Sequence, residues 1–260
     1  MIDASANIHP TALVESGAVI GANVEVGPFT YIAANVTVGE GSWIGSHVVI
    51  KGPTRIGARN KIFQFASVGE DCQDKKYAGE PTELVMGDDN VVRECVTIHR
   101  GTVQDKGVTR IANRCLFMAY VHIGHDCVVG DDVILANNVT LAGHVQIGNH
   151  AIVGGLSAFH QFVKVGDHAF IAGASAVHKD VPTYVMARGD NAHGINVEGL
   201  KRRGFSKEAI TLIRRAYKVI YRQNLTLEEA KPKLFEMADE CAEISPLAEF
   251  VMGSERGIVR

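Results

Sequence analysis

This 260-residue chain lacks the features that mark secreted, membrane-spanning or nucleic-acid-binding proteins. Its five cysteines are odd in number and form no CxxC pair, which argues against a disulfide framework and for a reducing compartment. No apolar run approaches the roughly 20 residues of a membrane span, and the opening MIDASANIHP resembles no secretory signal. The formal net charge of -3 leaves no overall basic excess for nucleic acid. We therefore expect a soluble, cytoplasmic protein with no membrane span and no nucleic-acid partner.

What the sequence has instead is a repeat of six residues. Stepping by six from Ile2 to Val68 meets an aliphatic residue every time, and a second run from Ile111 to Val177 meets an apolar one. Each hexad is expected to form one short strand and one corner, so three hexads form one coil with the apolar position inside. Stacking such coils about 4.8 Å apart gives a parallel β-helix. Parallel crossovers are normally right-handed, so the left-handed coil that we predict rests on resemblance to known hexapeptide-repeat proteins.

Two segments interrupt the repeat. The first, EDCQDKKYAGEPTE at 70–83, has polar residues where the inward position falls, and Met86 then resumes the original register. The second, RGTVQDKGVTR at 100–110, shifts the register by one residue. Both are predicted to be loops that leave the β-helix. Loops that interrupt a regular scaffold often carry function, although tolerated surface insertions are the other interpretation.

The repeat ends near residue 188, and helix signals follow it. Capping patterns predict helices over 206–221 and 226–241 and a third that opens at Ser245. We therefore expect a mainly β protein with two parts: a left-handed parallel β-helix of hexapeptide repeats at 1–188 and a small α-helical C-terminal domain at 189–260.

A repeat of 18 residues per coil also predicts which side chains stack. Two adjoining ladders contain His125, Gly143 and Gln161, and Asp126, His144 and Phe162. His122 and His160 fall in the same stretch, so several histidines converge within roughly 10–15 Å. An imidazole with a carboxylate neighbour suits general base catalysis, and a glycine N–H suits an oxyanion. The same histidines also suit a three-imidazole zinc site, or a polar ladder that only stabilises the solenoid.

A set of longer motifs decides between these interpretations. They are GEPT (79–82), TIHRGT (97–102), HIGHDC (122–127), LANNVTLAGHV (135–145), HQF (160–162), DVPTYV (180–185) and VEGLKRRGF (197–205). With them the sequence resembles, essentially from end to end, the UDP-N-acetylglucosamine O-acyltransferase family of lipid A biosynthesis. The resemblance implies transfer of an (R)-3-hydroxyacyl group to the sugar 3-hydroxyl, the first step of that pathway. It implies acyl carrier protein as the partner, with the acyl donor on its phosphopantetheine, and no metal or other cofactor. A flat-sided prism whose catalytic face lacks its own pocket further predicts a homotrimer with sites between subunits.

The resemblance also implies a role for each matching residue. His125 is expected to be the general base, Asp126 its partner, and Gly143 the backbone donor to the thioester oxyanion. Residues expected to contact the substrates are Gln73, Asp74, Lys76, His122, His144, His160, Gln161, Asn196, Glu198, Arg202 and Arg203. Gly173 matches the position that limits acyl-chain length, and a glycine there predicts a long chain. The segment DNAHG at 190–194 departs from the family pattern, because a histidine expected near Asn191 is absent.

An acidic carrier protein needs a basic surface on which to dock. We expect it at the start of the helical domain, formed by Lys201, Arg202, Arg203, Lys207, Arg214, Arg215, Lys218 and Arg222. The competing interpretations are an N-acyltransferase of the same pathway, a coenzyme A-dependent sugar acetyltransferase, a gamma-class zinc carbonic anhydrase and a non-catalytic solenoid scaffold.

Overall fold

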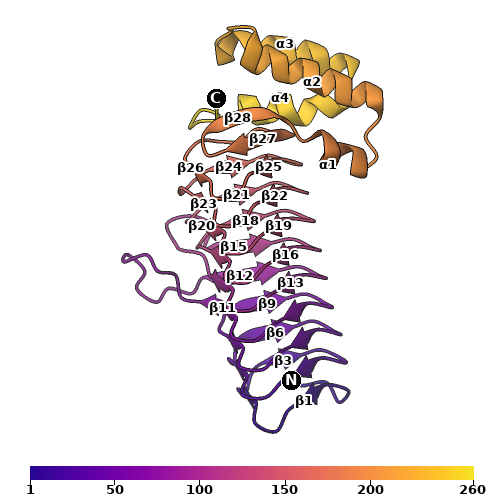
Figure 1. Ribbon diagram of the computed structural model, residues 1–260. Coiled ribbons are helices and arrows are strands. Elements are labelled where there is room, and N and C mark those ends of the chain that lie inside the picture. Colours follow the sequence, from indigo (N-terminus) through magenta and orange to yellow (C-terminus); the bar gives the residue numbers. More distant parts are fainter.

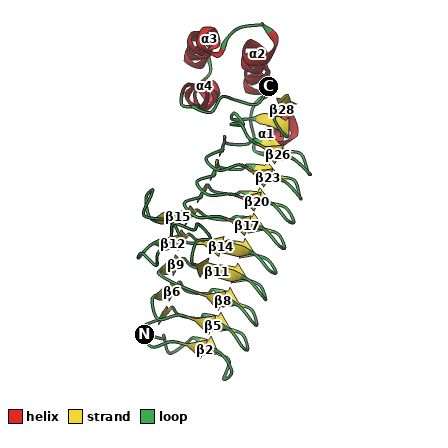
Figure 2. Cartoon of the chain, turned by 90° about the vertical axis from the view of Figure 1, so that its left-hand side faces the viewer, coloured by secondary structure: helices red, strands yellow, loops and turns green.

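The structure is a computed structural model that describes residues 1–260. It is a three-sided prism of short parallel strands with helices across its C-terminal end (Figures 1 and 2). Successive strands fall on three sheets in turn: an eleven-stranded sheet (face 1), a nine-stranded sheet (face 2) and an eight-stranded sheet (face 3). The turns from face 2 to face 3 form corner 2–3, and corners 3–1 and 1–2 are named in the same way. The predicted left-handed parallel β-helix followed by a helical domain is therefore confirmed.

Most strands are only two residues long. Face 1 contains β1 (Asn7–Ile8), β4 (Glu25–Val26), β7 (Trp43–Ile44), β10 (Lys61–Ile62), β13 (Val91–Val92), β16 (Leu116–Phe117), β19 (Ile134–Leu135), β22 (Ile152–Val153), β25 (Phe170–Ile171), β27 (Val185–Arg188) and β28 (Asn191–Ile195). Face 2 contains β2 (Leu13–Val14), β5 (Tyr31–Ile32), β8 (Val49–Ile50), β11 (Ser67–Glu70), β14 (Thr97–His99), β17 (His122–Ile123), β20 (Thr140–Leu141), β23 (Ala158–Phe159) and β26 (Ala176–Val177). Face 3 contains β3 (Val19–Ile20), β6 (Val36–Val38), β9 (Thr54–Ile56), β12 (Glu83–Met86), β15 (Val108–Ile111), β18 (Val128–Val129), β21 (Gln146–Ile147) and β24 (Lys164–Val165).

The strand register explains how the two interruptions fit the repeat. Neighbouring strands regularly pair residues 18 apart, as in β19 with β22. Between β10 and β13 the separation is 30, which is 12 more and equals two whole hexads. Between β14 and β17 it is 25, which is 7 more and equals one hexad plus one residue. The first loop therefore leaves the apolar register unchanged, and the second shifts it by one. Both loops leave the prism at corner 2–3.

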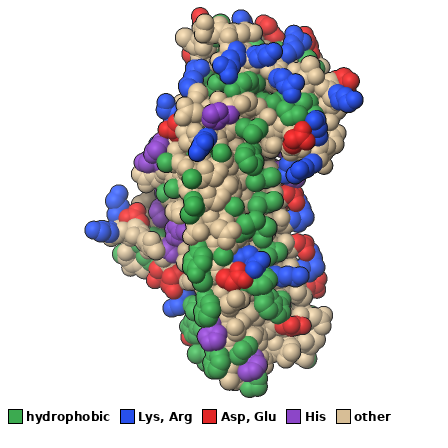
Figure 3. Space-filling view, in the orientation of Figure 1, with side chains coloured by type: hydrophobic (Ala, Val, Ile, Leu, Met, Phe, Trp, Pro, Cys, Tyr) green, Lys and Arg blue, Asp and Glu red, His purple; other side chains and the backbone are tan.

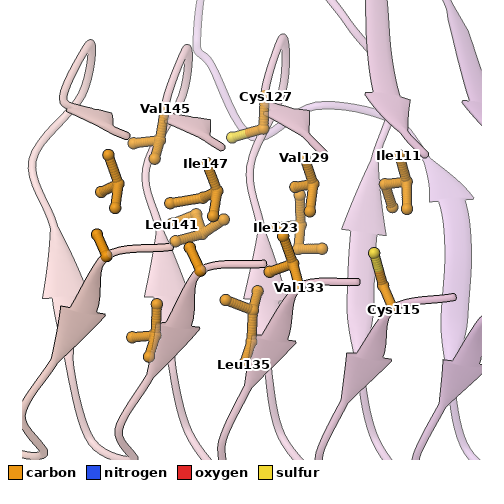
Figure 4. Packing of buried hydrophobic residues seen from close by; sticks show 14 of the residues in the cluster. Ile111, Cys115, Ile123, Cys127, Val129, Val133, Leu135, Leu141, Val145 and Ile147 are labelled. Carbon is orange, nitrogen blue, oxygen red and sulfur yellow. The ribbon is translucent and has the colours of Figure 1, made fainter. Parts of the chain in front are cut away.

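The core is the interior of the prism. Inward side chains such as Ile123, Leu135 and Ile147 are almost completely buried (Figure 4), and each contributes about 1.5–3 kcal/mol relative to exposure. Cys115 and Cys127 belong to the same packing. Burial raises the pKa of the Cys115 thiol to about 11 and that of Cys127 to about 12. Neither therefore supplies a thiolate nucleophile near neutral pH.

The C-terminal part begins with an antiparallel pair, β27 and β28, that extends face 1. The helices are α1 (Val197–Arg202), α2 (Lys207–Arg222), α3 (Leu227–Glu240), the 3-10 helix η1 (Ala242–Ile244) and α4 (Ser245–Met252). The predicted caps are confirmed, since Ser206 accepts from the Ala209 N–H and Thr226 forms a capping box with Glu229. The predicted boundary between 188 and 189 falls in the turn of the β27–β28 pair. None of the helices combines the length and apolarity needed to cross a membrane.

Candidate active site

The centre of the site is a histidine–aspartate pair at corner 2–3, between β17 and β18. His125 Nδ1 lies 2.9 Å from Asp126 Oδ2, and Asp126 adopts a φ of 57°, as the residue at this turn position does in successive coils. The second loop closes over the carboxylate, because the Thr102 N–H lies 3.0 Å from both oxygens and Thr102 Oγ1 donates to Oδ2 at 2.6 Å. Asp126 is consequently almost fully buried.

These contacts fix the protonation of the pair. Burial alone raises the pKa of Asp126, but the hydrogen bonds from His125 and Thr102 outweigh it and hold that pKa below its ordinary value. Asp126 is therefore ionised near neutral pH, and its Oδ2 accepts a hydrogen bond from the Nδ1–H of His125. The lone pair of His125 then lies on Nε2, which makes no hydrogen bond within the chain and is free to accept a proton from a ligand.

Gly143 lies beside His125 on the next coil. A Cβ atom at this position would stand 2.5 Å from Nε2 and 3.0 Å from Nδ1 of His125, so only a glycine leaves the ring in place. Its backbone N–H makes no hydrogen bond within the chain. A free N–H next to a basic nitrogen is the arrangement that an oxyanion needs.

His144 forms a second histidine–aspartate contact at the same corner. Its Nδ1 lies 3.0 Å from Asp105 Oδ2 of the second loop, and its ring stacks on Phe162 with centroids 4.3 Å apart. The other nitrogen, Nε2, lies 4.0 Å from Asp126 Oδ2. His144 also lines a second cavity of about 450 Å³ on face 3, which the Lys164 and Arg256 side chains border.

A groove of about 610 Å³ runs across face 2 next to this pair. It is lined by Gln73, Asp74, Lys75, His99, His122, Gly124, His125, Thr140, Ala142, Gly143 and Gln161. The structure therefore gathers six predicted residues here: Gln73, Asp74, His122, His125, Gly143 and Gln161. Figure 3 shows histidines gathered on the side of the prism from which the first loop projects.

His99 is a groove residue that sequence reasoning missed. Its ring packs edge-on against His122 at 5.0 Å, and His122 Nδ1 lies 2.7 Å from Thr97 Oγ1. Burial lowers the pKa of His99 to about 4, and burial also lowers that of His122. Both rings are therefore neutral near pH 7 and serve as hydrogen-bonding groups. The signal was present in the TIHRGT motif, which contains His99.

The first loop supplies one wall of the groove. The buried Arg100 anchors it, donating from Nη1 to the Gly69 carbonyl at 2.6 Å and from Nη2 to Tyr77 Oη at 2.9 Å and to Asp71. Asp74 lines the groove. The lysine that lines it beside Asp74 is Lys75 and not the predicted Lys76. Lys76 instead donates its backbone N–H to Asp74. Its predicted substrate contact stays a prediction.

His160 does not line the groove, although its neighbour Gln161 on the same coil does. Its Nδ1 is 3.2 Å from Arg256 Nη2 and 3.1 Å from the Gln161 carbonyl. Arg256 belongs to the C-terminal tail, and the sequence contained no signal for this contact across 96 residues.

The remaining predicted residues lie at other corners. Asn196 caps α1 by accepting from the Gly199 N–H, and it donates to the His168 carbonyl at corner 3–1. Arg203 donates to the His150 carbonyl at 3.1 Å, also at corner 3–1. Glu198 pairs with Lys201 on the exposed surface of α1, and Arg202 is exposed beside it. Gly173 lies at corner 1–2, between β25 and β26. One chain therefore does not bring these residues to His125, and their roles stay predictions.

His125, Asp126 and His144 are the group of side chains whose donor atoms could hold a metal ion. The possible ligand atoms of His125, Asp126 and His144 lie up to 4.8 Å apart. Tetrahedral zinc with bonds of about 2.1 Å needs its ligand atoms closer, at roughly 3.4 Å. Each imidazole Nδ1 is also already engaged by an aspartate.

Comparisons with known proteins show which family this chain resembles. Residues 180–259 match the family model described as UDP N-acetylglucosamine O-acyltransferase, domain 2, and residues 109–143 match the bacterial transferase hexapeptide repeats. A curated relative, the acyl-acyl-carrier-protein–UDP-N-acetylglucosamine O-acyltransferase of Thiobacillus denitrificans, is 55% identical over 98% of this chain and 100% of its own. The LpxA structure from Acinetobacter baumannii is 50% identical with a TM-score of 0.95, covering 97% of this chain and 99% of that one. The UDP-N-acetylglucosamine O-acyltransferase structure from Moraxella catarrhalis is 47% identical with a TM-score of 0.86, covering 100% and 99%. Given this similarity over nearly its whole length, the chain belongs to the UDP-N-acetylglucosamine O-acyltransferase family.

Proposed function

We propose that this chain transfers an (R)-3-hydroxyacyl group from acyl carrier protein to the 3-hydroxyl of UDP-N-acetylglucosamine, the first step of lipid A biosynthesis. The full-length similarity to enzymes of this name supports the reaction. One observation carries the proposal. Asp126 binds Nδ1 of His125, which leaves Nε2 without a partner at a groove that the free N–H of Gly143 adjoins.

The mechanism follows from these atoms. His125 Nε2 removes the proton of the sugar 3-hydroxyl as that oxygen attacks the thioester carbonyl. The ionised Asp126 stabilises the imidazolium that forms. The Gly143 N–H donates to the tetrahedral oxyanion, and collapse breaks the carbon–sulfur bond. The imidazolium then returns its proton to the carrier thiolate. No covalent acyl-enzyme is needed, and no metal or other cofactor takes part.

The groove residues suit the acceptor. The groove volume of about 610 Å³ falls within the range of small-molecule sites. Asp74 and Gln161 offer hydrogen bonds to sugar hydroxyls, and the neutral His122 can donate or accept. Lys75, on the rim, supplies a positive charge toward the diphosphate.

The site is completed between chains of a homotrimer in this proposal. Residues expected near the diphosphate, Arg202 and Arg203, lie at corner 3–1, one prism face away from His125 at corner 2–3. One face spans on the order of 15–20 Å of extended chain, too far for one diphosphate to bridge. A second copy that sets its corner 3–1 against corner 2–3 joins the two halves, and three copies close the arrangement. Light scattering is expected to give three times 28.0 kDa, and a monomer would contradict it.

An apolar ridge supports the association of copies. Exposed apolar side chains recur along corner 1–2 on every second coil, at Phe29, Phe65, Tyr120 and Leu156, each about 60–70% exposed. Figure 3 shows apolar side chains running in a column along the prism. So many large apolar side chains exposed along one edge are unusual on a monomer.

The carrier protein is proposed to dock on α2. Arg214, Arg215, Lys218 and Arg222 are all exposed, whereas the opposite surface of the helix is buried against its neighbours. This basic surface complements an acidic carrier.

The reaction is tested by incubating labelled UDP-N-acetylglucosamine with 3-hydroxyacyl carrier proteins of several lengths and with an acyl-coenzyme A control. An alkali-labile ester on the sugar, formed best from a long 3-hydroxyacyl carrier protein, is the expected product. Equal use of coenzyme A would indicate a sugar acetyltransferase, and an alkali-stable amide on an amino-sugar acceptor would indicate the N-acyltransferase. No acyl transfer from any donor would refute the proposal.

A further inference from the structure

The second loop forms hydrogen bonds with the carboxylate of Asp126 through one residue, Thr102. It is about 1% exposed and donates both its backbone N–H and its hydroxyl to the carboxylate of Asp126. The N–H lies 3.0 Å from both oxygens, and the hydroxyl lies 2.6 Å from Oδ2, the same oxygen that faces His125. A carboxylate held in this way cannot rotate about its χ2 angle without losing a hydrogen bond.

We propose that Thr102 is a positioning residue for the catalytic pair, which it serves by fixing the plane and the charge of Asp126. This inference rests on the function proposed above. Asp126 then presents Oδ2 to His125 Nδ1 at 2.9 Å and keeps Nε2 directed at the groove. The second loop at 100–110 therefore supports the catalytic pair directly, because it carries a hydrogen-bond donor to Asp126 that the regular coils lack.

A second threonine, Thr109, bonds the backbone of Asp126 and not its carboxylate. It lies on β15, is fully buried, and accepts a hydrogen bond at its Oγ1 from the Asp126 backbone N–H at 2.8 Å. It therefore holds the main chain of Asp126 at the corner, whereas Thr102 holds the carboxylate. Both side chains are buried threonines that bond the same residue, so substituting each by valine gives a matched pair.

The pH dependence distinguishes the two further. The titratable groups nearest Asp126 are His125 beside it, His144 on the next coil and Cys72 from the first loop. The charged groups that line a cavity with it are Asp105, Lys106 and Arg110. Removing a hydrogen bond from the ionised carboxylate favours its protonated form. The pKa of Asp126 should therefore rise in Thr102→Val, and it should stay in place in Thr109→Val, which keeps every hydrogen bond to the carboxylate.

The experiment compares Thr102→Val, Thr102→Ser and Thr109→Val with the unmodified enzyme by the acyl-transfer assay over a range of pH. We expect Thr102→Val to lose about tenfold in kcat with the KM for UDP-N-acetylglucosamine nearly unchanged. The pKa of Asp126, followed by carboxyl carbon NMR, should rise in the same variant. Thr102→Ser should stay within about threefold because it keeps the hydroxyl. Thr109→Val should lose stability in thermal unfolding, lose less kcat than Thr102→Val, and leave the pKa of Asp126 in place. Equal kcat losses in both valine variants, or no rescue by serine, would overturn the inference.

A measurement on the free enzyme keeps this test independent of the proposed reaction. The proton on His125 Nδ1 should give a low-field NMR signal, assigned by its absence in His125→Ala. The signal should persist in Thr102→Ser and Thr109→Val, and it should shift or disappear in Thr102→Val. An unchanged signal in Thr102→Val would contradict the positioning role, whereas a missing acyl-transfer activity alone would refute only the function.

Discussion

Substituting Gly143 by alanine tests the geometry of the base directly. The new methyl group would stand 2.5 Å from His125 Nε2 and also against Cε1, whereas ordinary carbon contacts are about 3.5 Å or longer. The ring must therefore move by about 1 Å, and the hydrogen bond to Asp126 must lengthen or break. A displacement of this size costs about 10²-fold in rate. Because a side chain and not the backbone has to shift, the loss of stability should be only about 1–3 kcal/mol.

The assay is kcat for acyl transfer, with thermal unfolding measured on the same preparation. Gly253→Ala is the control, because its new methyl would lie 3.5 Å from the Glu249 carbonyl, an ordinary contact, and far from the groove. The control should keep full activity. A Gly143→Ala enzyme with kcat within twofold of the unmodified protein would refute the reasoning, because either the ring tolerates the methyl or its position does not limit the reaction.

Three further predictions concern the same site and its partner surface. His125→Ala should lower kcat by at least about 10²-fold, and a near-normal kcat would remove it from the base role. The pKa of Asp126 lies below its ordinary 3.8 in the folded state, so its carboxylate stabilises the fold above about pH 4 and this contribution is lost as the pH falls through the lowered pKa. The stability difference between the unmodified protein and Asp126→Asn, followed by denaturant unfolding, should accordingly shrink below pH 4, and a difference independent of pH would contradict the pairing. Arg215→Glu with Lys218→Glu should raise the KM for the carrier-bound donor while leaving that for UDP-N-acetylglucosamine unchanged, and unchanged donor kinetics would dismiss this docking surface.

The β-helix could be predicted because its pattern is local and strict. The apolar residue of every hexad points inward, so the period of six alone determines which residues are buried and which stack. The phase slip after the second loop was visible in the sequence, and its cause, an insertion of seven residues, follows from the pairing of β14 with β17. The stacking of His125, Gly143 and Gln161 was predictable for the same reason.

The rest of the site lacked such a signal. Arg256 reaches His160 from the C-terminal tail, and no periodicity links two residues so far apart. Lys75 lines the groove in place of Lys76 because an irregular loop has no fixed alternation of side chains. The short helix α1 was missed because six residues are too few for an apolar period to be visible.

The placement of α1 matters most for the function. Residues up to about 180 can be assigned to a corner from the period of 18, but the chain beyond them has no such period. The resemblance to the family implied that Arg202 and His125 act on one ligand, and the sequence could not show that one chain holds them at different corners.

Mixing two inactive variants tests most directly whether one site is completed by two copies of this chain. His125→Ala and Arg202→Glu should each have little activity alone. In trimers reassembled from an equal mixture, one site in four pairs an intact corner 2–3 with an intact corner 3–1, so about a quarter of the unmodified activity should return. His125→Ala mixed with Asp126→Asn is the control and should recover none, because both changes lie at the same corner. If the mixture of His125→Ala and Arg202→Glu stayed as inactive as either variant alone, that result would contradict the shared site.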